Sequence, residues 1–270
     1  MTIMFLIRSL DWYGGAQRQL VSLASGLSRA GHDVVVVTYY PDVPLERELT
    51  EAGVEVRSLG KRSRWDLLRP IMRFVRLVRN SQPVVLHGYL STANILTVLA
   101  KACYPSVKVV WGLRGSNMHW EEYDWLHKLS FVVERVLSRF ADLLIVNSYA
   151  GREHYASSGF PVDKMIVIHN GIDTARFRPD KDAGRAMRNQ WGINERNRVV
   201  CLAGRLDPMK DHATFIKAAA LLSQRRTDVR FVCVGQGADD YKHALQALAK
   251  REGIADRMIW GVFLRYEAGV

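Results

Sequence analysis

A loop rich in glycine and cations follows a short apolar run in the last third of the chain. Residues 199–203, VVCLA, lead into residues 204–210, GRLDPMK, and a stretch with helical spacing, 212–224, follows at once. Glycine lets the backbone approach a ligand, arginine presents a planar fork of donors, lysine carries a point charge, and the unpaired amides of a helix start favour an anion. The loop is therefore predicted to bind a phosphate or diphosphate.

An alternative is that the two cations of this loop, Arg205 and Lys210, pair with its aspartates, Asp207 and Asp211, and stay solvated. The position between a buried strand and a helix start favours the anion site over that alternative. Residues 235–237, Gly-Gln-Gly, follow the next apolar run and are predicted to lie at the same sheet edge.

Three further groups of glycines and polar residues follow apolar runs in the first half of the chain. Gly14 and Gly15 open a helical stretch, His87 ends the fourth run, and residues 114–117, Arg-Gly-Ser-Asn, follow the fifth. Because ligands bind beyond the carboxyl ends of parallel strands, these groups together predict a cleft. Each signal alone also fits a tight turn or a structural histidine.

The elements that would position these residues alternate between short apolar runs and longer helical patterns. The runs are residues 3–7, 34–38, 54–59, 84–87, 107–113, 143–147 and 165–169. The helical patterns are residues 17–29, 66–80, 92–103 and 121–140. This rhythm predicts a doubly wound α/β domain over residues 1–172.

A second, smaller α/β unit is predicted after a polar connection. Residues 173–196 are expected to form a linker and the first helix of the second domain, and residues 197–270 the rest of it. Strands are predicted at 199–203, 230–234 and 258–260, with helices at 212–224 and 239–251. Three strands predict an incomplete Rossmann-like domain beside a complete one.

Composition narrows the classes of protein that fit. The 270 residues are 48% hydrophobic and 24% charged, as in ordinary folded proteins, and the net charge of +11 favours an anionic partner. The start has no basic leader, which predicts a cytoplasmic protein. Cys103, Cys201 and Cys233 are far apart in apolar segments and are expected to be reduced core residues, with no metal site among them.

Four motifs in order resemble glycosyltransferase family 4. They are residues 14–17, GGAQ; residues 167–173, VIHNGID, with Phe177 and Pro179; the loop 204–210; and residues 234–237, VGQG. The resemblance runs to about Gly261. It implies the GT-B fold, with two Rossmann-like domains, and transfer of a sugar from a UDP- or GDP-sugar with retention of configuration. The acceptor implied is a polysaccharide or glycolipid, such as a lipopolysaccharide, and no metal or other cofactor is required.

The resemblance also implies roles for single residues. Arg205 and Lys210 match the family's diphosphate clamp and are the candidate catalytic pair. The implied donor-binding residues are Gly14, Gly15, Gly204, Gly235 and Gly237. Those expected on the acceptor side are His87, Arg114 and Ser116.

Two departures from the family pattern qualify these roles. Arg114 stands where many members have a histidine, so no catalytic histidine is carried over. Residues 263–270 do not match the family segment that holds the donor sugar, which predicts a truncated donor domain and weak or absent transfer by this chain. A catalytically inactive binding fragment and a sugar-nucleotide epimerase on the same scaffold remain alternatives.

A basic helix suggests one more partner. Arg69, Arg73 and Arg76 share one face of the pattern 66–80, opposite an apolar face expected to pack in the core. Such a helix predicts peripheral contact with an anionic membrane surface. No helix-turn-helix, RNP-like or zinc pattern accompanies the charge, so nucleic acid is not an expected partner.

Overall fold

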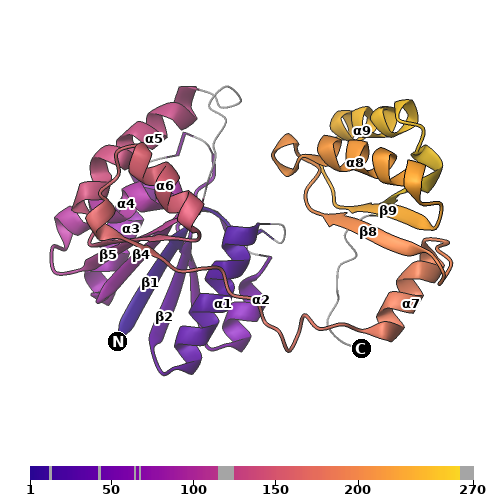
Figure 1. The fold of residues 1–270 in the computed structure, drawn as a ribbon. Helices are drawn as coiled ribbons and strands as arrows, with labels where there is room; N and C mark the ends of the chain where they lie inside the picture. The colour runs from indigo at the N-terminus through magenta and orange to yellow at the C-terminus, as the bar shows by residue number, and fades with distance from the viewer. Residues whose placement is uncertain (12–13, 42–43, 64, 67, 115–124, 262–270) are drawn as a thin grey trace. The chain divides into compact units, whose positions relative to one another are not determined.

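The computed structural model describes residues 1–11, 14–41, 44–63, 65–66, 68–114 and 125–261. The chain divides into two compact units, Met1–Ile172 (unit 1) and Asp173–Val270 (unit 2), each with its own sheet and helices (Figure 1). Both are α/β, as the sequence predicts.

Unit 1 is built on a seven-stranded parallel sheet with the order β3-β2-β1-β4-β5-β6-β7. Its strands are β1 Thr2–Ile7, β2 Asp33–Thr38, β3 Glu55–Ser58, β4 Val85–Tyr89, β5 Lys108–Leu113, β6 Leu143–Val146 and β7 Met165–Val167. Phe5 of β1 is in register with Val36 of β2 on one side and with His87 of β4 on the other. The first strand of the chain is therefore central in the sheet.

Helices cover both faces of this sheet (Figure 1). One face is covered by α1 Gly15–Arg29 and α2 Glu46–Glu51, through Leu20 of α1 and Leu49 of α2. The other is covered by α3 Leu68–Ser81, α4 Ser91–Cys103, α5 Trp125–Leu137 and α6 Tyr149–Ser157, together with the short 3-10 turns Ser138–Phe140 and Val162–Lys164. The apolar runs of the central strands are nearly continuous because both faces are buried.

Unit 2 has a three-stranded parallel sheet among its described residues, in the order β10-β9-β8. Its elements are α7 Lys181–Gln190, β8 Arg198–Ala203, α8 His212–Arg225, β9 Val229–Val234, α9 Asp239–Arg251 and β10 Met258–Gly261, with 3-10 turns at Pro208–Lys210 and Ala255–Arg257. Ile216 of α8, Leu245 of α9 and Phe231 of β9 share its core. The predicted strands and helices all form, within a few residues of their expected ends.

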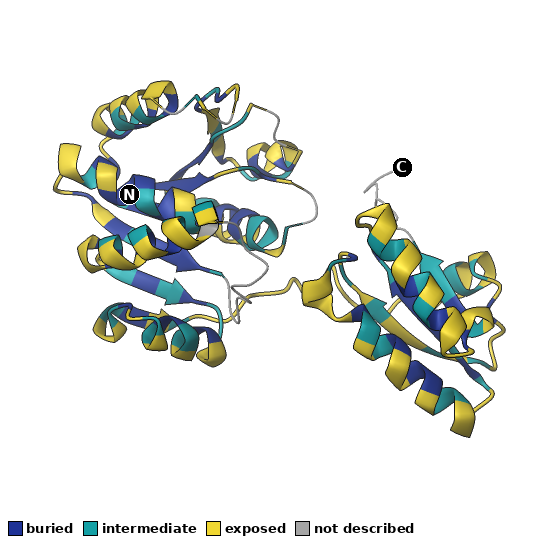
Figure 2. Ribbon diagram, turned by 90° about the horizontal axis from the view of Figure 1, so that it is seen from above, coloured by how far each residue is buried: buried dark blue, intermediate teal, exposed yellow. Residues whose placement is uncertain are grey.

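Strand β8 lies at an edge of the unit 2 sheet among the described residues, and most of its side chains are exposed (Figure 2). This position corrects the prediction for the cysteines. Cys233, in the middle strand, is buried, whereas Cys201 on β8 and Cys103 at the end of α4 are exposed. An apolar run identifies a strand, but neighbouring strands decide whether its side chains are covered.

Two short helices of unit 1 were not predicted from the sequence. Helix α2 has only six residues and one buried side chain, Leu49. Helix α6 contains Gly151, which weakens its helical pattern, but Ser148 caps it by accepting a hydrogen bond from the Gly151 amide. No helix among the described residues is both long and apolar enough to cross a bilayer.

Candidate functional site

The loop 204–210 of unit 2 connects β8 to α8 through two aspartate-stabilised turns. Asp207 Oδ1 accepts a hydrogen bond from the Met209 amide at 3.0 Å and begins the 3-10 turn. Asp211 follows in the left-handed region with φ 49°, and its Oδ1 accepts from the Thr214 amide at 3.2 Å. Asp211 therefore caps α8 and fixes the end of the loop at the helix start.

The glycines at 235 and 237 are required by a close approach between two loops. The amides of Gly204 and Leu206 donate to the carbonyls of Val234 and Gln236, each at 2.9 Å. A Cβ atom on Gly235 would overlap the carbonyl oxygen of Gly204, and one on Gly237 would overlap that of Leu206. Packing alone thus accounts for both glycines, and their role near a nucleotide stays a prediction.

The two cations of the loop have different partners. Arg205 Nη2 lies 2.9 Å from Asp207 Oδ2. One of the two ion pairs expected under the alternative of a solvated loop is therefore formed. No ion pair is recorded for Lys210 among the described residues, and its stem packs near Gly204, with Cγ 3.6 Å from where a Cβ on that glycine would stand. Arginine has five N–H donors, so the Asp207 contact orients the guanidinium and leaves donors for an anion.

His212, the first residue of α8, was not identified from the sequence as part of this site. Its side chain is fully buried, and neither ring nitrogen has a hydrogen-bond partner in the part of the chain that the structure describes. Burial lowers its pKa, while Asp207 and Asp211 act in the opposite direction. A polar residue directly after the capping Asp211 was the available signal, but its burial depends on tertiary packing.

In unit 1 a compact aromatic and polar cluster lies at the carboxyl end of β4. His87 packs between Phe5 and Tyr89, with ring centroids 5.1 Å and 4.8 Å away. Leu90, directly after the strand, has φ 72°, which is rare for a residue with a branched side chain. Strained backbone of this kind is common where a chain turns sharply at a functional site.

Arg114, at the end of β5, joins this cluster to the segment after β7. Its Nη2 donates to the Tyr89 hydroxyl at 2.9 Å, and its Nη1 donates to Asn170 Oδ1 at 2.7 Å. The guanidinium also lies over the Tyr89 ring, 4.8 Å from its centroid. The sequence predicts site roles for Arg114 and His87; Tyr89, at the same strand end, and Asn170, in the motif 167–173, complete the cluster without having been assigned such roles.

Two buried nitrogens in this cluster have no hydrogen-bond partner among the described residues. They are His87 Nε2 and Arg114 Nε, which lie 3.4 and 3.5 Å from the place that a Cβ atom on Gly112 would occupy. Burial, followed by the charge of Arg114, lowers the pKa of His87 to about 3, so the ring is neutral near pH 7. A neutral imidazole beside a guanidinium suits hydrogen bonding to a hydroxyl group. Ser116 lies in residues 115–124, outside the described residues.

The glycine pair at the start of α1 is open on one side. Gly14 packs against the Gln17 side chain, whereas a Cβ on Gly15 would meet no atom of the described residues within 4 Å. Gln19, one turn further on, pairs with the backbone of Gly171: its Nε2 donates to the carbonyl at 2.7 Å and its Oε1 accepts from the amide at 3.0 Å. Helix α1 therefore holds residue 171 beside the helix start, and the space at Gly15 fits close approach of a ligand.

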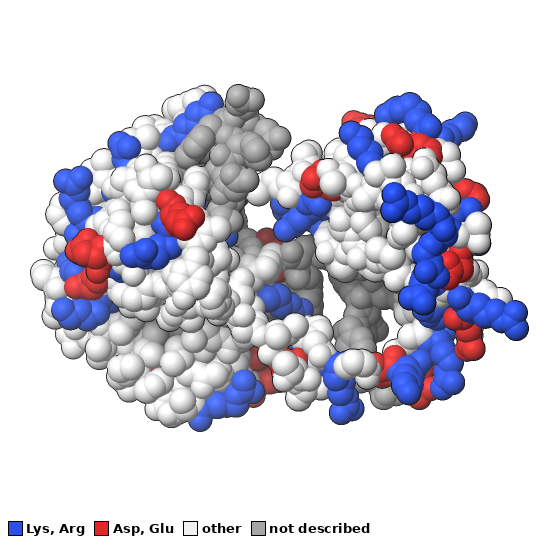
Figure 3. Space-filling model, in the orientation of Figure 1, with Lys and Arg blue, Asp and Glu red and all other residues white. Residues whose placement is uncertain are grey.

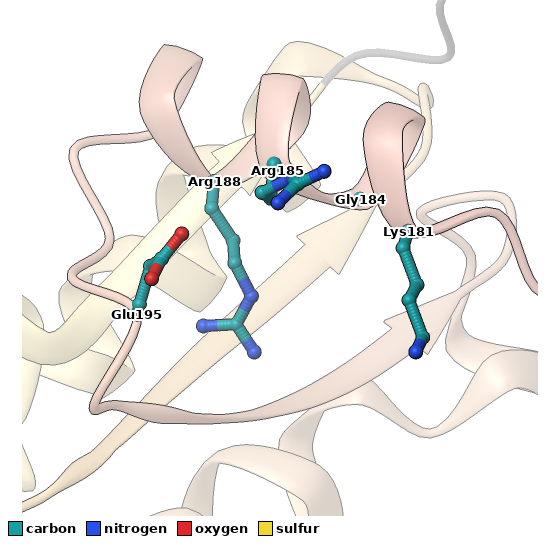
Figure 4. A pocket seen from close by; sticks show the side chains of 5 residues that line it. All are labelled: Lys181, Gly184, Arg185, Arg188 and Glu195. Carbon is teal, nitrogen blue, oxygen red and sulfur yellow. The ribbon is translucent and has the colours of Figure 1, made fainter.

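A shallow hollow of about 360 Å³ on unit 2 belongs to neither group of residues. It lies along α7 and is lined by Lys181, Gly184, Arg185, Arg188 and Glu195 (Figure 4). Arg188 ties the helix to the carbonyl of Asn197 at 2.9 Å, and Arg185 is paired with Asp182. Two of its three cations thus have structural partners, and we assign the hollow no function.

Comparison with protein families gives two matches along the chain. Residues 13–176 match the family described as Glycosyltransferase Family 4, and residues 184–268 match Glycosyl transferases group 1. The second match extends past Gly261, where the resemblance was expected to end. Both units are therefore recognised, and each match includes its unit's glycine turns.

Individual relatives agree with this assignment. A GDP-mannose-dependent alpha-(1-6)-phosphatidylinositol monomannoside mannosyltransferase of Mycolicibacterium smegmatis is 32% identical over 146 residues, which is 54% of this chain and 37% of the relative. The putative glycosyltransferase EpsF of Bacillus subtilis is 24% identical over 82% of this chain and 63% of the relative. The chain thus spans between about a third and two thirds of these relatives.

Solved structures confirm the GT-B architecture. HepE of Anabaena, solved in complex with UDP-glucose, has a TM-score of 0.81 at 24% identity over 98% of this chain and 69% of that chain. The UDP-GlcNAc 2-epimerase of Neisseria meningitidis also aligns over 98% of this chain and 73% of that chain, with a TM-score of 0.61 at 12% identity. The fold alone does not separate transferase from epimerase; the family matches do.

Proposed function

The chain belongs to glycosyltransferase family 4, and from that premise we propose that it takes part in transfer of a sugar from a nucleoside diphosphate sugar to a carbohydrate or lipid-linked acceptor. We assign donor binding to the loop 204–210 of unit 2 and acceptor binding to the cluster of His87 and Arg114 in unit 1. The epimerase alternative is supported by the fold alone, whereas the two family matches are both to glycosyltransferases.

The observation that carries this proposal is the construction of the loop 204–210. Its backbone is fixed by hydrogen bonds to residues 234 and 236, and it presents exposed Arg205 and Lys210 at the carboxyl end of β8. Two cations on a fixed loop stabilise a departing diphosphate with little reorganisation, which is the main requirement for sugar transfer. In this proposal they balance the charge that a metal ion balances in other transferases.

The proposed reaction exchanges one bond at the anomeric carbon. The bond to the diphosphate oxygen breaks, a bond to an acceptor hydroxyl oxygen forms on the same face, and the hydroxyl proton passes to the departing phosphate. Arg205 and Lys210 take up the negative charge that develops on the diphosphate. Neutral His87 and Arg114 Nε offer hydrogen bonds that position the acceptor hydroxyl.

We also propose a peripheral position at the inner face of the cell membrane, with α3 as one contact. Arg69 and Arg76 are exposed, and no ion pair is recorded for either among the described residues. Arg73 differs from them because its Nη1 donates to the Leu59 carbonyl at 2.8 Å, which anchors the helix to the end of β3. This arrangement supports contact with anionic headgroups through Arg69 and Arg76 more than through Arg73.

Calorimetric titration with UDP-glucose and GDP-mannose tests the donor site. Loss of a charge-assisted hydrogen bond costs about 1.5–3 kcal/mol, so Arg205→Ala should weaken binding of the preferred donor by roughly tenfold to hundredfold. Arg225→Ala removes an exposed cation at the far end of α8 and serves as the matched control, with expected unchanged affinity.

The titration is run with and without EDTA, and affinity should not depend on the chelator. Equal affinity of wild type and Arg205→Ala, or no affinity for either nucleotide sugar, would contradict the donor assignment. Conversion of a UDP-sugar to its epimer would favour the epimerase alternative instead.

A further inference from the structure

Glu134 is the one acidic residue of helix α5, and it is buried. Figure 3 shows Asp and Glu side chains on the surface of unit 1, where water solvates them, whereas Glu134 is 1% exposed. Its Oε1 accepts a hydrogen bond from Asn94 Nδ2 at 2.7 Å, and Ser91 forms a second hydrogen bond with the carboxyl group. Burial raises the pKa of Glu134, against the effect of these hydrogen bonds. Removal of a carboxyl group from water is costly, so its contacts with α4 require an explanation.

The helix that Glu134 contacts begins without a capping side chain of its own. Leu90 occupies the N-cap position of α4 and makes no capping hydrogen bond with its side chain to the described residues, and the first turn has no acidic residue. Leu90 also has φ 72°, a strained value for this residue type. The unpaired N–H groups of a helix start favour a nearby acceptor. Glu134 brings one from another helix, and it contacts the first turn of α4 through Ser91 and Asn94.

Asn94 connects Glu134 to the end of β4. Asn94 is fully buried, and its backbone amide donates to the Leu90 carbonyl at 2.9 Å. A Cβ atom on Gly88 would stand 2.7 Å from Asn94 Oδ1 and 2.9 Å from Asn94 Cα, so the β4 backbone packs directly on Asn94. The end of β4 therefore cannot move toward α4 without displacing the residue that Glu134 holds.

A second set of buried hydrogen bonds connects Asn94 to β5. Thr97 Oγ1 donates to the Asn94 carbonyl at 2.6 Å, and Trp111 Nε1 of β5 donates to Thr97 Oγ1 at 3.0 Å. Thr97 and Trp111 have no exposed surface. The next residue, Gly112, accepts a hydrogen bond from the Leu90 amide at 3.3 Å, which joins the end of β4 to β5. Both strand ends thus belong to the same buried network as Glu134.

The ends of β4 and β5 carry the cluster of His87 and Arg114. His87 directly precedes Gly88, and Arg114 directly follows β5. A hydrogen bond to a reacting hydroxyl group depends on position, since a misplacement of about 1 Å can cost about a hundredfold in rate. We propose that Glu134 is a positioning residue for the acceptor site, which holds both strand ends through Asn94 and so positions His87 and Arg114. This role depends on the acceptor function proposed above for the cluster.

Anchoring of α5 alone is the competing explanation for Glu134. Phe131, one turn earlier on α5, already packs in the unit 1 core. The helix therefore has an apolar anchor that does not need the hydrogen bond between Glu134 and Asn94. If Glu134 served only as a second anchor, its loss would lower the stability of unit 1 and leave the ends of β4 and β5 unchanged in the folded protein.

Hydrogen exchange of the whole chain, followed by NMR, tests the positioning role. In Glu134→Ala, the Leu90 amide should exchange about tenfold to hundredfold faster, because its hydrogen bond to Gly112 joins the two strand ends and loses its support. The ring-nitrogen resonances of His87, assigned with His87→Phe, should shift in the same variant. Glu134→Gln retains an oxygen that can accept from Asn94 and should restore both readouts.

Asp142→Ala is the matched control, because Asp142 binds the opposite end of α4. Its Oδ2 accepts from Lys101 Nζ at 2.5 Å and from the Val109 amide at 2.8 Å, near the start of β5. This variant should speed exchange of the Val109 amide and leave exchange of the Leu90 amide unchanged. Glu134→Ala should give the reverse pattern.

Equal acceleration of the Leu90 and Val109 amides in Glu134→Ala would indicate a general loss of stability and would overturn the positioning role. So would unchanged His87 resonances in that variant. If Glu134→Ala does not fold, Asn94→Ala, which removes only the connecting side chain, is measured with the same two probes and the same expectations. Neither readout depends on a nucleotide sugar, so the titration with UDP-glucose and GDP-mannose separates a failure of this role from a failure of the proposed function.

Discussion

The first strand of unit 1 and the first strand of unit 2 have similar apolar sequences and opposite surroundings. β1 lies between β2 and β4 and is covered by helices on both faces, whereas β8 pairs only with β9 among the described residues. Leu6 of β1 has no exposed surface, while Val200 of β8 is 39% exposed. The same local pattern thus gives a core strand or an edge strand, and the number of its neighbours decides which.

Truncation of one buried residue in β1 and one exposed residue in β8 should give the largest difference in the free energy of unfolding. Leu6→Ala leaves a cavity between packed layers and should lower the free energy of unfolding of unit 1 by about 2–5 kcal/mol. Val200→Ala removes atoms that are already partly hydrated and should change that of unit 2 by less than about 1 kcal/mol. Hydrogen–deuterium exchange of the β1 and β8 amides reports each unit separately. Equal losses would show that β8 is as well covered as β1.

The glycine turns allow a second comparison between the units, with a smaller effect. Gly235→Ala would force the Gly204 carbonyl away and should cost unit 2 about 1–3 kcal/mol, as overpacking does. Gly15→Ala meets no neighbour within the described ranges and should leave unit 1 unchanged or stabilise it by less than about 1 kcal/mol. Urea unfolding of both variants provides the measurement. A destabilised Gly15→Ala protein would show that its open space is needed by the fold itself.

The smallest effect concerns pH and a buried histidine in each unit. The pKa of His87 is lowered to about 3, so between that value and its unfolded pKa the unfolded state binds more protons than the folded state. Unit 1 should therefore lose about 1 kcal/mol of stability as the pH falls from about 6 to 5 because of this residue. His87→Phe should flatten that part of the profile. His212→Phe should flatten the profile of unit 2 less, since Asp207 and Asp211 oppose the burial effect there; an equal change would contradict this comparison.

Much of the fold follows from local sequence patterns because each element's signal is complete within its own residues. The run 199–203 predicts a strand without reference to anything else. Its exposure could not be predicted in this way, and the error over Cys201 arose from assuming that an apolar strand is covered on both sides. The end of β4 was also placed too early, since Gly88 and Tyr89 interrupt the apolar run but pair with β5.

The sequence predicts those site residues whose chemistry follows from their residue type. It does not predict contacts that depend on how distant segments pack together. Arg205 and Lys210 follow from their types and their place before a helix. The pairing of Arg205 with Asp207 was one of two arrangements that the sequence allowed. The contacts of Tyr89 and Asn170 with Arg114 could not be predicted, because only the fold brings these residues to Arg114 from positions 25 and 56 residues away.

The packing of the Gly204–Leu206 backbone against residues 235–237 also constrains how this loop tolerates mutation. The nearest atoms that exclude a side chain at Gly235 and Gly237 are carbonyl oxygens, which every amino acid possesses. No exchange of a neighbouring side chain can remove them, so a loss at either glycine has no simple second-site suppressor. A randomised library of this turn should therefore return to glycine at both positions, while Gln236 between them accepts substitution.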